Sequence, residues 1–192
     1  MKPGERVLVH AGASGVGTLA IQLCRALGNP VFATTSASKV EFVFEQGATR
    51  VWDRHEPGFL SSLEASLEAV DIILDPVGGS YLQTNLRLLR EQGRLVLIGV
   101  LGGFEGSLDL RRVLLRRLRL VGSTLRARGR EEKVSLTKRL REEVWPLFAS
   151  RQLCPVVSAV VPWRAVEAAH QKMAANQTRG KVVLEIVSEV DL

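Results

Sequence analysis

The chain has 192 residues, of which 46% are hydrophobic and 24% charged, fractions that are ordinary for a globular protein. Its formal net charge is +6, which could suggest a nucleic-acid partner. It contains no apolar run near the roughly 20 residues of a membrane-spanning helix and no apolar signal-peptide core at its start. Its two cysteines cannot by themselves build a structural zinc site. We therefore expect a cytoplasmic protein with reduced thiols, no metal and no membrane partner.

Strand and helix signals alternate regularly over the first 125 residues. Strands are predicted over 6–10, 31–35, 49–52, 70–74, 95–100 and 118–125, and helices over 16–28, 39–46, 60–68, 81–90 and 108–117. Such alternation indicates βαβ units and a parallel sheet. Six strands are enough for a doubly wound parallel sheet of the Rossmann type, so we predict an α/β fold that binds a nucleotide.

The pattern changes after Leu125. A long helix is predicted over 131–150, bent or ended near Pro146, followed by an extended segment over 155–162, a helix over 165–175 and a strand over 181–187. This tail does not continue the earlier rhythm and has no evident partner within the chain. We therefore divide the chain into a dinucleotide-binding domain (1–150) and a C-terminal α/β tail (151–192).

A glycine-rich turn joins the first strand to the first helix. Its sequence, Gly12-Ala13-Ser14-Gly15-Val16-Gly17, has the strand-turn-helix context of a dinucleotide-binding fingerprint. Gly12 would permit a tight turn, and Gly17 would allow close packing of the helix on the sheet. The N–H groups of Ser14, Gly15 and Val16 would face the phosphates at the positive end of the helix. The alternative is a turn that binds no ligand.

The end of the second strand bears on which nicotinamide cofactor binds. An NAD site usually carries Asp or Glu about 20 residues after the glycines. Here residues 32–39 read FATTSASK, and the first carboxylate is Glu41. Thr34, Ser36 and Lys39 suit a 2′-phosphate instead, so the sequence favours NADPH over NADH. Ser36 and Ser38 could also cap the next helix, and the two roles are compatible.

Eight arginines lie between Arg111 and Arg130, interleaved with leucine and valine and not with aromatic residues. We interpret them as a solvated helix face and strand end. The alternatives are a surface that binds a polyanion, or a few arginines that face a phosphorylated cofactor. A nucleic-acid partner is therefore not expected.

Five blocks follow one another along the chain: ERVLVHAGASGVGTLAIQLCRALG, DIILDPVGGSYL, GRLVLIGVLGG, GSTLRAR and EAAHQKMAANQTRGKVVLEI. Together they resemble the zinc-free quinone oxidoreductase branch of the medium-chain dehydrogenase/reductases, and the resemblance covers essentially the whole chain. It implies an NADPH-dependent oxidoreductase that transfers a hydride from the nicotinamide to a small quinone or activated double bond.

The resemblance also implies the residues that contact the cofactor. Residues 14–17 would hold the pyrophosphate, whereas Ser36, Lys39, Arg54 and Asn176 would lie at the 2′-phosphate; relatives carry an aromatic residue or histidine where Arg54 stands. Gly78 and Gly79 would line the cofactor cleft. Residues 99–102 would run beside the nicotinamide, and Thr124 and Leu125 would close that side. The complete predicted set is Gly12, Ser14, Gly15, Val16, Gly17, Thr34, Ser36, Lys39, Arg54, Gly78, Gly79, Gly99, Val100, Leu101, Gly102, Thr124, Leu125 and Asn176.

In that family a substrate-binding domain precedes the nucleotide domain, and the chain later returns to complete it. The resemblance implies that residues 155–187 belong to this first domain, which the present sequence lacks. It predicts exposed apolar surface on Val182, Val183, Leu184 and Ile186. Acceptor-binding residues would come largely from that domain, so no catalytic residue is assigned. The alternative function is an NADP(H)-binding module without turnover.

The last predicted sheet strand, residues 118–125, forms an apolar edge that needs covering. In relatives this edge pairs with its counterpart across a two-fold axis. We therefore expect a homodimer in which Leu118, Leu120 and Val121 contact the second copy.

Overall fold

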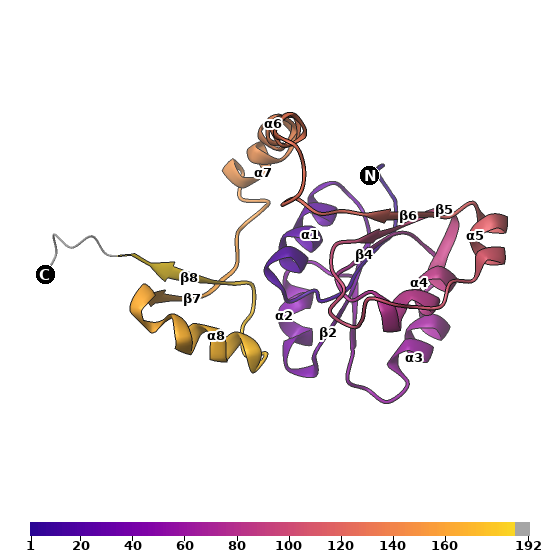
Figure 1. The fold of residues 1–192 in the computed structure, drawn as a ribbon, viewed down its shortest axis with the longest axis horizontal. Helices are drawn as coiled ribbons and strands as arrows, with labels where there is room; N and C mark the ends of the chain where they lie inside the picture. Colours follow the sequence, from indigo (N-terminus) through magenta and orange to yellow (C-terminus); the bar gives the residue numbers. More distant parts are fainter. Residues whose placement is uncertain (187–192) are drawn as a thin grey trace, which may run out of the picture.

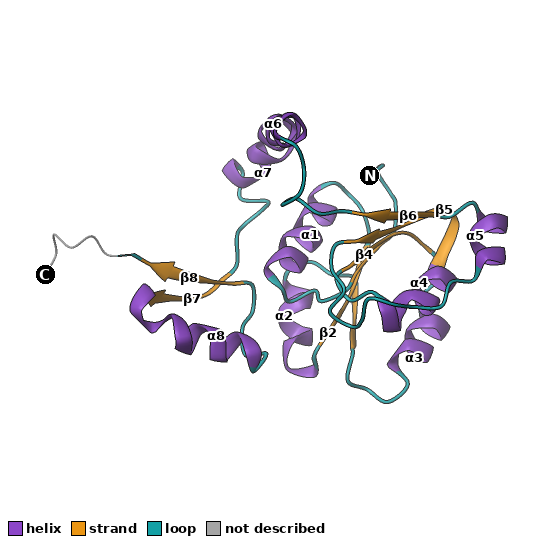
Figure 2. Ribbon diagram, in the orientation of Figure 1, coloured by secondary structure: helices purple, strands orange, loops and turns teal. Residues whose placement is uncertain are grey.

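The computed structural model describes residues 1–186 and contains two sheets with their flanking helices (Figures 1 and 2). The strands are β1 (Val7–Val9), β2 (Val31–Thr35), β3 (Arg50–Asp53), β4 (Val70–Asp75), β5 (Leu89–Leu97), β6 (Arg119–Gly122), β7 (Val157–Pro162) and β8 (Lys181–Glu185). The helices are α1 (Gly15–Ala26), α2 (Val40–Glu45), α3 (Phe59–Ser66), α4 (Leu82–Leu88), α5 (Leu110–Arg116), α6 (Arg130–Arg139), α7 (Trp145–Ala149) and α8 (Val166–Ala174).

The larger sheet has six strands in the order β3-β2-β1-β4-β5-β6, and every neighbouring pair is parallel. This is the strand order of a doubly wound, Rossmann-type domain. The predicted fold class is confirmed. The order reverses beside β1, which pairs with β2 on one side and β4 on the other, and the loops after these three strands meet at one edge of the sheet.

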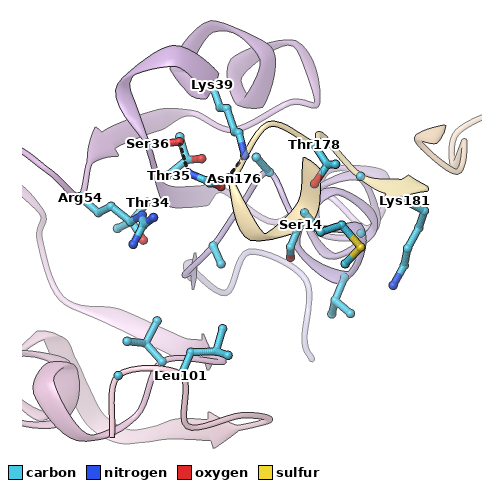
Figure 3. Close-up of a pocket in the computed structure, with 18 of the residues that line it drawn as sticks. Ser14, Thr34, Thr35, Ser36, Lys39, Arg54, Leu101, Asn176, Thr178 and Lys181 are labelled. Atoms are coloured by element: carbon cyan, nitrogen blue, oxygen red, sulfur yellow. Dashed lines mark hydrogen bonds between the residues drawn. The ribbon is translucent and has the colours of Figure 1, made fainter. Parts of the chain in front are cut away.

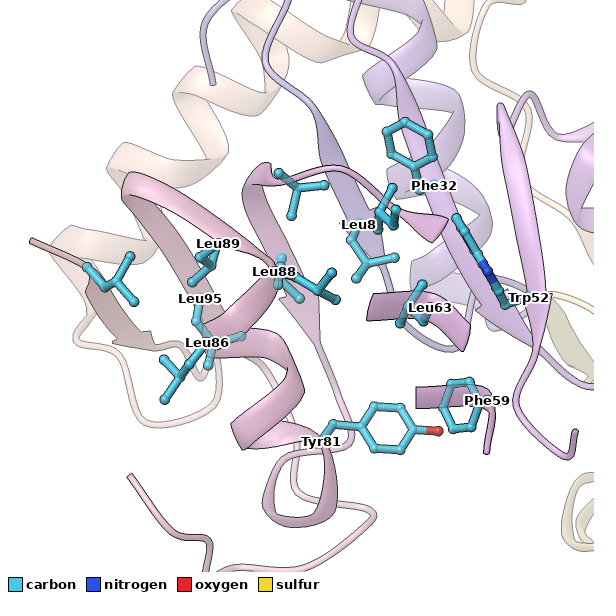
Figure 4. Packing of buried hydrophobic residues seen from close by; sticks show 14 residues of the cluster. Leu8, Phe32, Trp52, Phe59, Leu63, Tyr81, Leu86, Leu88, Leu89 and Leu95 are labelled. Atoms are coloured by element: carbon cyan, nitrogen blue, oxygen red, sulfur yellow. The ribbon is translucent and has the colours of Figure 1, made fainter. Parts of the chain in front are cut away.

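Two apolar clusters lie on opposite faces of this sheet, because alternate side chains of each strand point to opposite faces. Val7 and Val9 pack in the cluster that contains Ile21 of α1 and Val43 of α2. Leu8, between them, packs in the cluster that contains Leu63 of α3 and others of α4, shown in Figure 4. The helices therefore cover both faces of the sheet.

The main difference from the predicted elements lies at the junction of α4 and β5. The predicted helix 81–90 ends at Leu88, and the predicted strand 95–100 already begins at Leu89. Leu89 pairs with Val70 of β4, and the register then shifts before Arg94 pairs with Ile72. Helical spacing of the leucines suggested a longer helix, but pairing with β4 draws this segment into the sheet.

The helical segment after β6 is interrupted, as predicted. Residues Leu140–Val144 form a wide π-helical turn between α6 and α7, immediately before Trp145 and Pro146. A proline within a helix removes one N–H donor and clashes with the preceding turn, and a π-helical turn accommodates both effects.

The C-terminal tail forms a second, two-stranded parallel sheet, in which β7 pairs with β8 and α8 connects them. Figure 1 shows this unit beside α1 and α2. The expectation that the tail has no partner in the chain is wrong, because Gly180 N–H donates to the Ala13 carbonyl at 2.8 Å. The predicted apolar surface is present on Val183, Leu184 and Ile186, the last 80% exposed, whereas Val182 is half-buried. Val187, the predicted end of the last strand, lies outside the described residues.

No helix within residues 1–186 combines the length and the apolar character needed to cross a membrane.

Several arginines of the arginine-rich segment bind carbonyl groups and carboxylates instead of projecting only into solvent. Arg112 donates to the carbonyls of Leu86 and Arg87 at the end of α4, at 2.9 and 2.7 Å, and Arg116 donates to the Leu89 carbonyl at 2.9 Å. The last carbonyls of a helix have no partner within it, so a cation placed there stabilises the helix end. Part of the positive charge thus has an intramolecular role.

We expect the replacement Arg112→Met to lower the free energy of unfolding by about 1 kcal/mol, because two carbonyls lose a charged donor while the apolar stem is kept. Arg111→Met is the matched control, since the exposed Arg111 makes no hydrogen bond or ion pair within residues 1–186. Urea unfolding of both variants provides the measurement. Equal losses in the two variants would show that capping of α4 contributes nothing specific.

Candidate nucleotide-binding site

A cavity of about 750 Å³ lies at the carboxyl end of the sheet, between the loops after β1 and β2 and the C-terminal tail (Figure 3). This is the edge at which open α/β sheets bind ligands. The residues that line it are Ala11, Ala13, Ser14, Gly15, Val16, Thr34, Thr35, Ser36, Lys39, Arg54, Val77, Ser80, Tyr81, Leu101, Gly102, Met173, Asn176, Thr178, Gly180, Lys181 and Val182.

The glycine-rich turn forms one wall of the cavity and ends in the N-cap of α1. The Ser14 hydroxyl oxygen accepts a hydrogen bond from Gly17 N–H at 3.0 Å. Ser14 N–H is not free for a ligand, as it donates to the Ala11 carbonyl at 2.9 Å. The N–H groups of Gly15 and Val16 are in the first turn of the helix, where backbone donors have no intrahelical acceptor. These two groups remain available to an anion.

Two glycines of the turn lack a side chain for different reasons. A Cβ on Gly17 would stand 2.4 Å from the Ala11 carbonyl oxygen, a backbone atom that cannot move aside. A Cβ on Gly15 would meet the Lys181 side chain at 2.2 Å. Gly17 therefore keeps the turn and helix in close contact, whereas Gly15 makes room for a lysine that arrives from the tail.

A cluster of cations and small polar groups lies where β2 ends. Lys39 is only 6% exposed, and its ammonium donates to the Asn176 side-chain oxygen at 2.6 Å. Asn176 in turn donates to the Ser36 hydroxyl at 3.4 Å, and Arg179 donates to the Ser38 carbonyl at 3.1 Å. Ser36 makes no side-chain cap to the following helical turn, so its hydroxyl stays within this cluster.

The charge of this cluster is not neutralised by an acid within residues 1–186, where Lys39, Arg54 and Arg179 form no ion pair. Burial, together with the nearby guanidinium groups of Arg54 and Arg179, lowers the pKa of the Lys39 ammonium. A cation that is buried beside other cations is unfavourable unless an anion joins it. A negative group at this cluster would therefore be stabilised.

Beneath the cavity a chain of buried polar side chains links the ends of three strands. His10, which is 1% exposed, contacts Thr34 Oγ1 through Nδ1 at 2.9 Å and Asn85 Oδ1 through Nε2 at 2.8 Å. Asn85 donates to Asp75 at 2.9 Å, and Asp75 accepts hydrogen bonds from Val77 N–H and Gly78 N–H. Burial lowers the pKa of His10, so its ring is neutral near pH 7.

The structure brings together part of the predicted cofactor-binding set. The cavity is lined by Ser14, Gly15, Val16, Thr34, Ser36, Lys39, Arg54, Leu101, Gly102 and Asn176. Gly12, Gly17, Gly78, Gly79, Gly99 and Val100 lie in the same loops without lining it. Thr124 and Leu125 do not line it either, and Leu125 is 64% exposed, because β6 ends at Gly122 and the chain turns away.

Several lining residues were not predicted from sequence. Thr178, Gly180 and Lys181 reach the cavity only because the tail docks beside the glycine turn, so local patterns carried no signal for them beyond their closeness to Asn176. Tyr81 packs edge-on against His10, with ring centroids 4.9 Å apart, and is buried. Met173 is exposed at the cavity rim and is not a core residue.

Comparison with known proteins identifies the family to which this site belongs. Residues 15–141 match the family described as zinc-binding dehydrogenase. The chain belongs to this dehydrogenase family. Its assignment to the medium-chain dehydrogenase/reductases, expected from the sequence blocks, is confirmed. Within residues 1–186 no three His, Cys, Asp or Glu side chains are grouped so that they could share a metal ion.

Two curated proteins and one solved structure illustrate the relationship. The synaptic vesicle membrane protein VAT-1 homolog of Rattus norvegicus is 30% identical over 96% of this chain and 50% of its own length. The quinone oxidoreductase of Sus scrofa is 27% identical over 96% of this chain and 55% of its own. A mycobacterial protein solved in complex with NADPH is 29% identical, with a TM-score of 0.81 over 96% of this chain and 57% of its own.

This dehydrogenase chain therefore spans about half the length of the curated relatives it matches.

The buried histidine should make the stability of this dehydrogenase fold depend on pH. Because the folded chain favours the neutral ring, the unfolded chain binds more protons once the pH falls below the ordinary value of 6.5. The free energy of unfolding should fall by up to about 1.4 kcal/mol per pH unit in that range. In His10→Gln this part of the slope should be missing. Urea unfolding between about pH 7.5 and about pH 5 tests this, and equal slopes in the two proteins would contradict it.

Proposed function

We propose that this chain binds NADPH and forms the cofactor-binding half of an oxidoreductase of the zinc-free quinone oxidoreductase type. The observation that carries the proposal is the buried Lys39 ammonium, which lies near Arg54 and Arg179 and forms no ion pair with a carboxylate of residues 1–186. The end of the second strand is where a Rossmann fold discriminates a ribose 2′-hydroxyl from a 2′-phosphate, and cations there favour the phosphate. Neutralisation by this phosphate would offset the cost of burying Lys39.

The remaining residues of the cavity fit the other parts of NADPH. We assign the pyrophosphate to the N–H groups of Gly15 and Val16, to the Ser14 hydroxyl, which donates to no group among residues 1–186, and to Lys181, whose side chain passes beside Gly15. A cavity of about 750 Å³ is within the range of cofactor sites.

The nicotinamide would lie toward the loop of Leu101 and Gly102, on the side of Val77. When bound, it supplies a hydride for a quinone or an activated double bond. In this proposal residues 1–150 form the nucleotide-binding domain, and residues 151–192 form the segment that completes the substrate domain. The tail contributes Asn176 and Lys181 to the cofactor while its β8 residues offer an apolar surface to that domain.

The variant Lys39→Met tests the 2′-phosphate assignment. Loss of one buried charge-assisted contact should weaken NADPH binding by about 10- to 100-fold and leave NADH binding unchanged. Titration calorimetry with both cofactors provides the measurement. The control is Lys138→Met on the exposed face of α6. Lys138 does not line the cavity, so both affinities should stay at the wild-type values. A wild-type chain with equal affinities for NADPH and NADH would overturn the assignment.

A quinone turnover assay on the same preparation separates the two functions considered for this chain. NADPH oxidation that depends on added quinone would establish an enzyme. Tight NADPH binding without turnover would instead favour a cofactor-binding module that needs a further domain to act on a substrate.

We also propose a homodimer through the open side of β6. Leu120 and Val121 are 37% and 43% exposed there, whereas Leu118 is buried in the core and is not available to a partner. Ser123 N–H donates to the Leu97 carbonyl, so by strand alternation Leu120 N–H points away from β5.

Leu120→Pro should therefore remove a donor from the free edge, keep the pairing of β5 with β6, and yield a monomer. Leu120→Val keeps that donor and is the matched control. Sedimentation equilibrium of the three proteins measures the outcome, and a monomeric wild type would rule out this interface.

A further inference from the structure

The buried polar network beneath the cavity joins Thr34, His10, Asn85 and Asp75. The donor and acceptor of each hydrogen bond in this network can be assigned in turn from the Asp75 end. Asp75 accepts Val77 N–H at 2.7 Å and Gly78 N–H at 3.0 Å through Oδ1, and it accepts Asn85 Nδ2 through Oδ2. Asn85 therefore presents its oxygen to His10. An amide oxygen only accepts, so the proton of the imidazole is on Nε2.

The other imidazole nitrogen then fixes the hydroxyl of Thr34. In a neutral ring that carries its proton on Nε2, Nδ1 is an acceptor. Nδ1 lies 2.9 Å from Thr34 Oγ1, so the Thr34 hydroxyl must donate its proton to His10. The Thr34 oxygen keeps only lone pairs for other contacts, and Thr34 forms part of the cavity wall (Figure 3).

The surroundings of the ring hold this arrangement in place. His10, Thr34, Asn85 and Asp75 are all buried, and each has its polar partners within this group of side chains. Tyr81 packs edge-on against the imidazole, with an interplanar angle of 73°, and it also lines the cavity. Satisfied polar networks of this kind are rigid because each member has its partners already.

We propose that His10 is a positioning residue for the nucleotide: by accepting the proton of Thr34, it makes the Thr34 hydroxyl a fixed hydrogen-bond acceptor for an O–H or N–H donor of the bound dinucleotide. The inference rests on the proposed binding of NADPH. Through Asn85 and Asp75 the same polar network hydrogen-bonds the backbone of Val77 and Gly78. It therefore connects Thr34, at the end of β2, to the loop after β4.

The first measurement concerns the wild-type chain without cofactor. Long-range proton–nitrogen NMR correlations of His10 should show a neutral ring protonated on Nε2. A ring protonated on Nδ1 would overturn the proposal, whatever the chain binds. This result does not depend on the proposed function.

The second measurement is a double-mutant cycle read as the dissociation constant of NADPH. Thr34→Val removes the acceptor, and His10→Gln keeps a donor for Asn85 but releases the Thr34 proton. Each variant should weaken NADPH binding about fivefold, which corresponds to the loss of one hydrogen bond. The double variant should bind no worse than either single variant. Thr34→Ser, which retains the hydroxyl, should restore affinity.

Thr84→Val is the matched control, because Thr84 is a buried threonine outside the cavity lining, and NADPH binding should be unchanged. Suppose that His10→Gln lowers the unfolding temperature and yet leaves the dissociation constant of NADPH at the wild-type value. That result would show a purely structural role for His10 and refute the proposal. If His10→Gln does not fold, the protonation of His10 in the wild-type chain, taken with the affinities of Thr34→Val and Thr34→Ser, still decides it. Absence of NADPH binding in the wild type would refute the proposed function instead.

Discussion

The pairing of β1 with β2 on one side and β4 on the other is the constraint on which the rest of this structure depends. Parallel strands end at the same edge, so the glycine turn, the Ser36–Lys39 segment and the Asp75–Gly78 loop are brought together there although they are far apart in sequence. The buried polar network of His10, Thr34, Asn85 and Asp75 connects the same three strand ends. Both the ligand cavity and its support thus arise from one topological feature.

Two groups of polar residues at the cavity differ in their electrostatics. Around Lys39 the fold places cations together with no ion-paired acid among residues 1–186, which is unfavourable unless an anion binds. Beneath Thr34 the polar groups are already paired with one another, which favours a neutral imidazole. The cations around Lys39 favour a bound anion, and the paired polar groups hold the Thr34 hydroxyl in a fixed orientation. Both lie close to the carboxyl end of β2, where dinucleotide sites distinguish their cofactors.

The C-terminal tail forms one wall of the cavity. Its main-chain contact from Gly180 to Ala13 and the side-chain contacts of Asn176 and Arg179 fasten it to the nucleotide domain. Further along the tail, Val183, Leu184 and Ile186 are exposed. One short segment therefore both lines the cavity and exposes an apolar surface.

The sequence by itself determined the α/β class, the six strands, the glycine turn and the polar end of β2. These features follow from local patterns: apolar periodicity, glycine spacing and the residues that end a strand. Near Leu89 the same reasoning failed, because pairing with β4 outweighed the helical spacing of the leucines.

Only the tertiary structure decided which side chains meet. The roles of Lys181, Tyr81 and His10, and the turn of the chain away from the cavity at Thr124 and Leu125, depend on contacts between segments distant in sequence. Local sequence patterns do not predict contacts between distant segments. The physical reason is that strand pairing and tail docking are long-range, so the partner of a buried polar group is set by the fold and not by its neighbours in the chain.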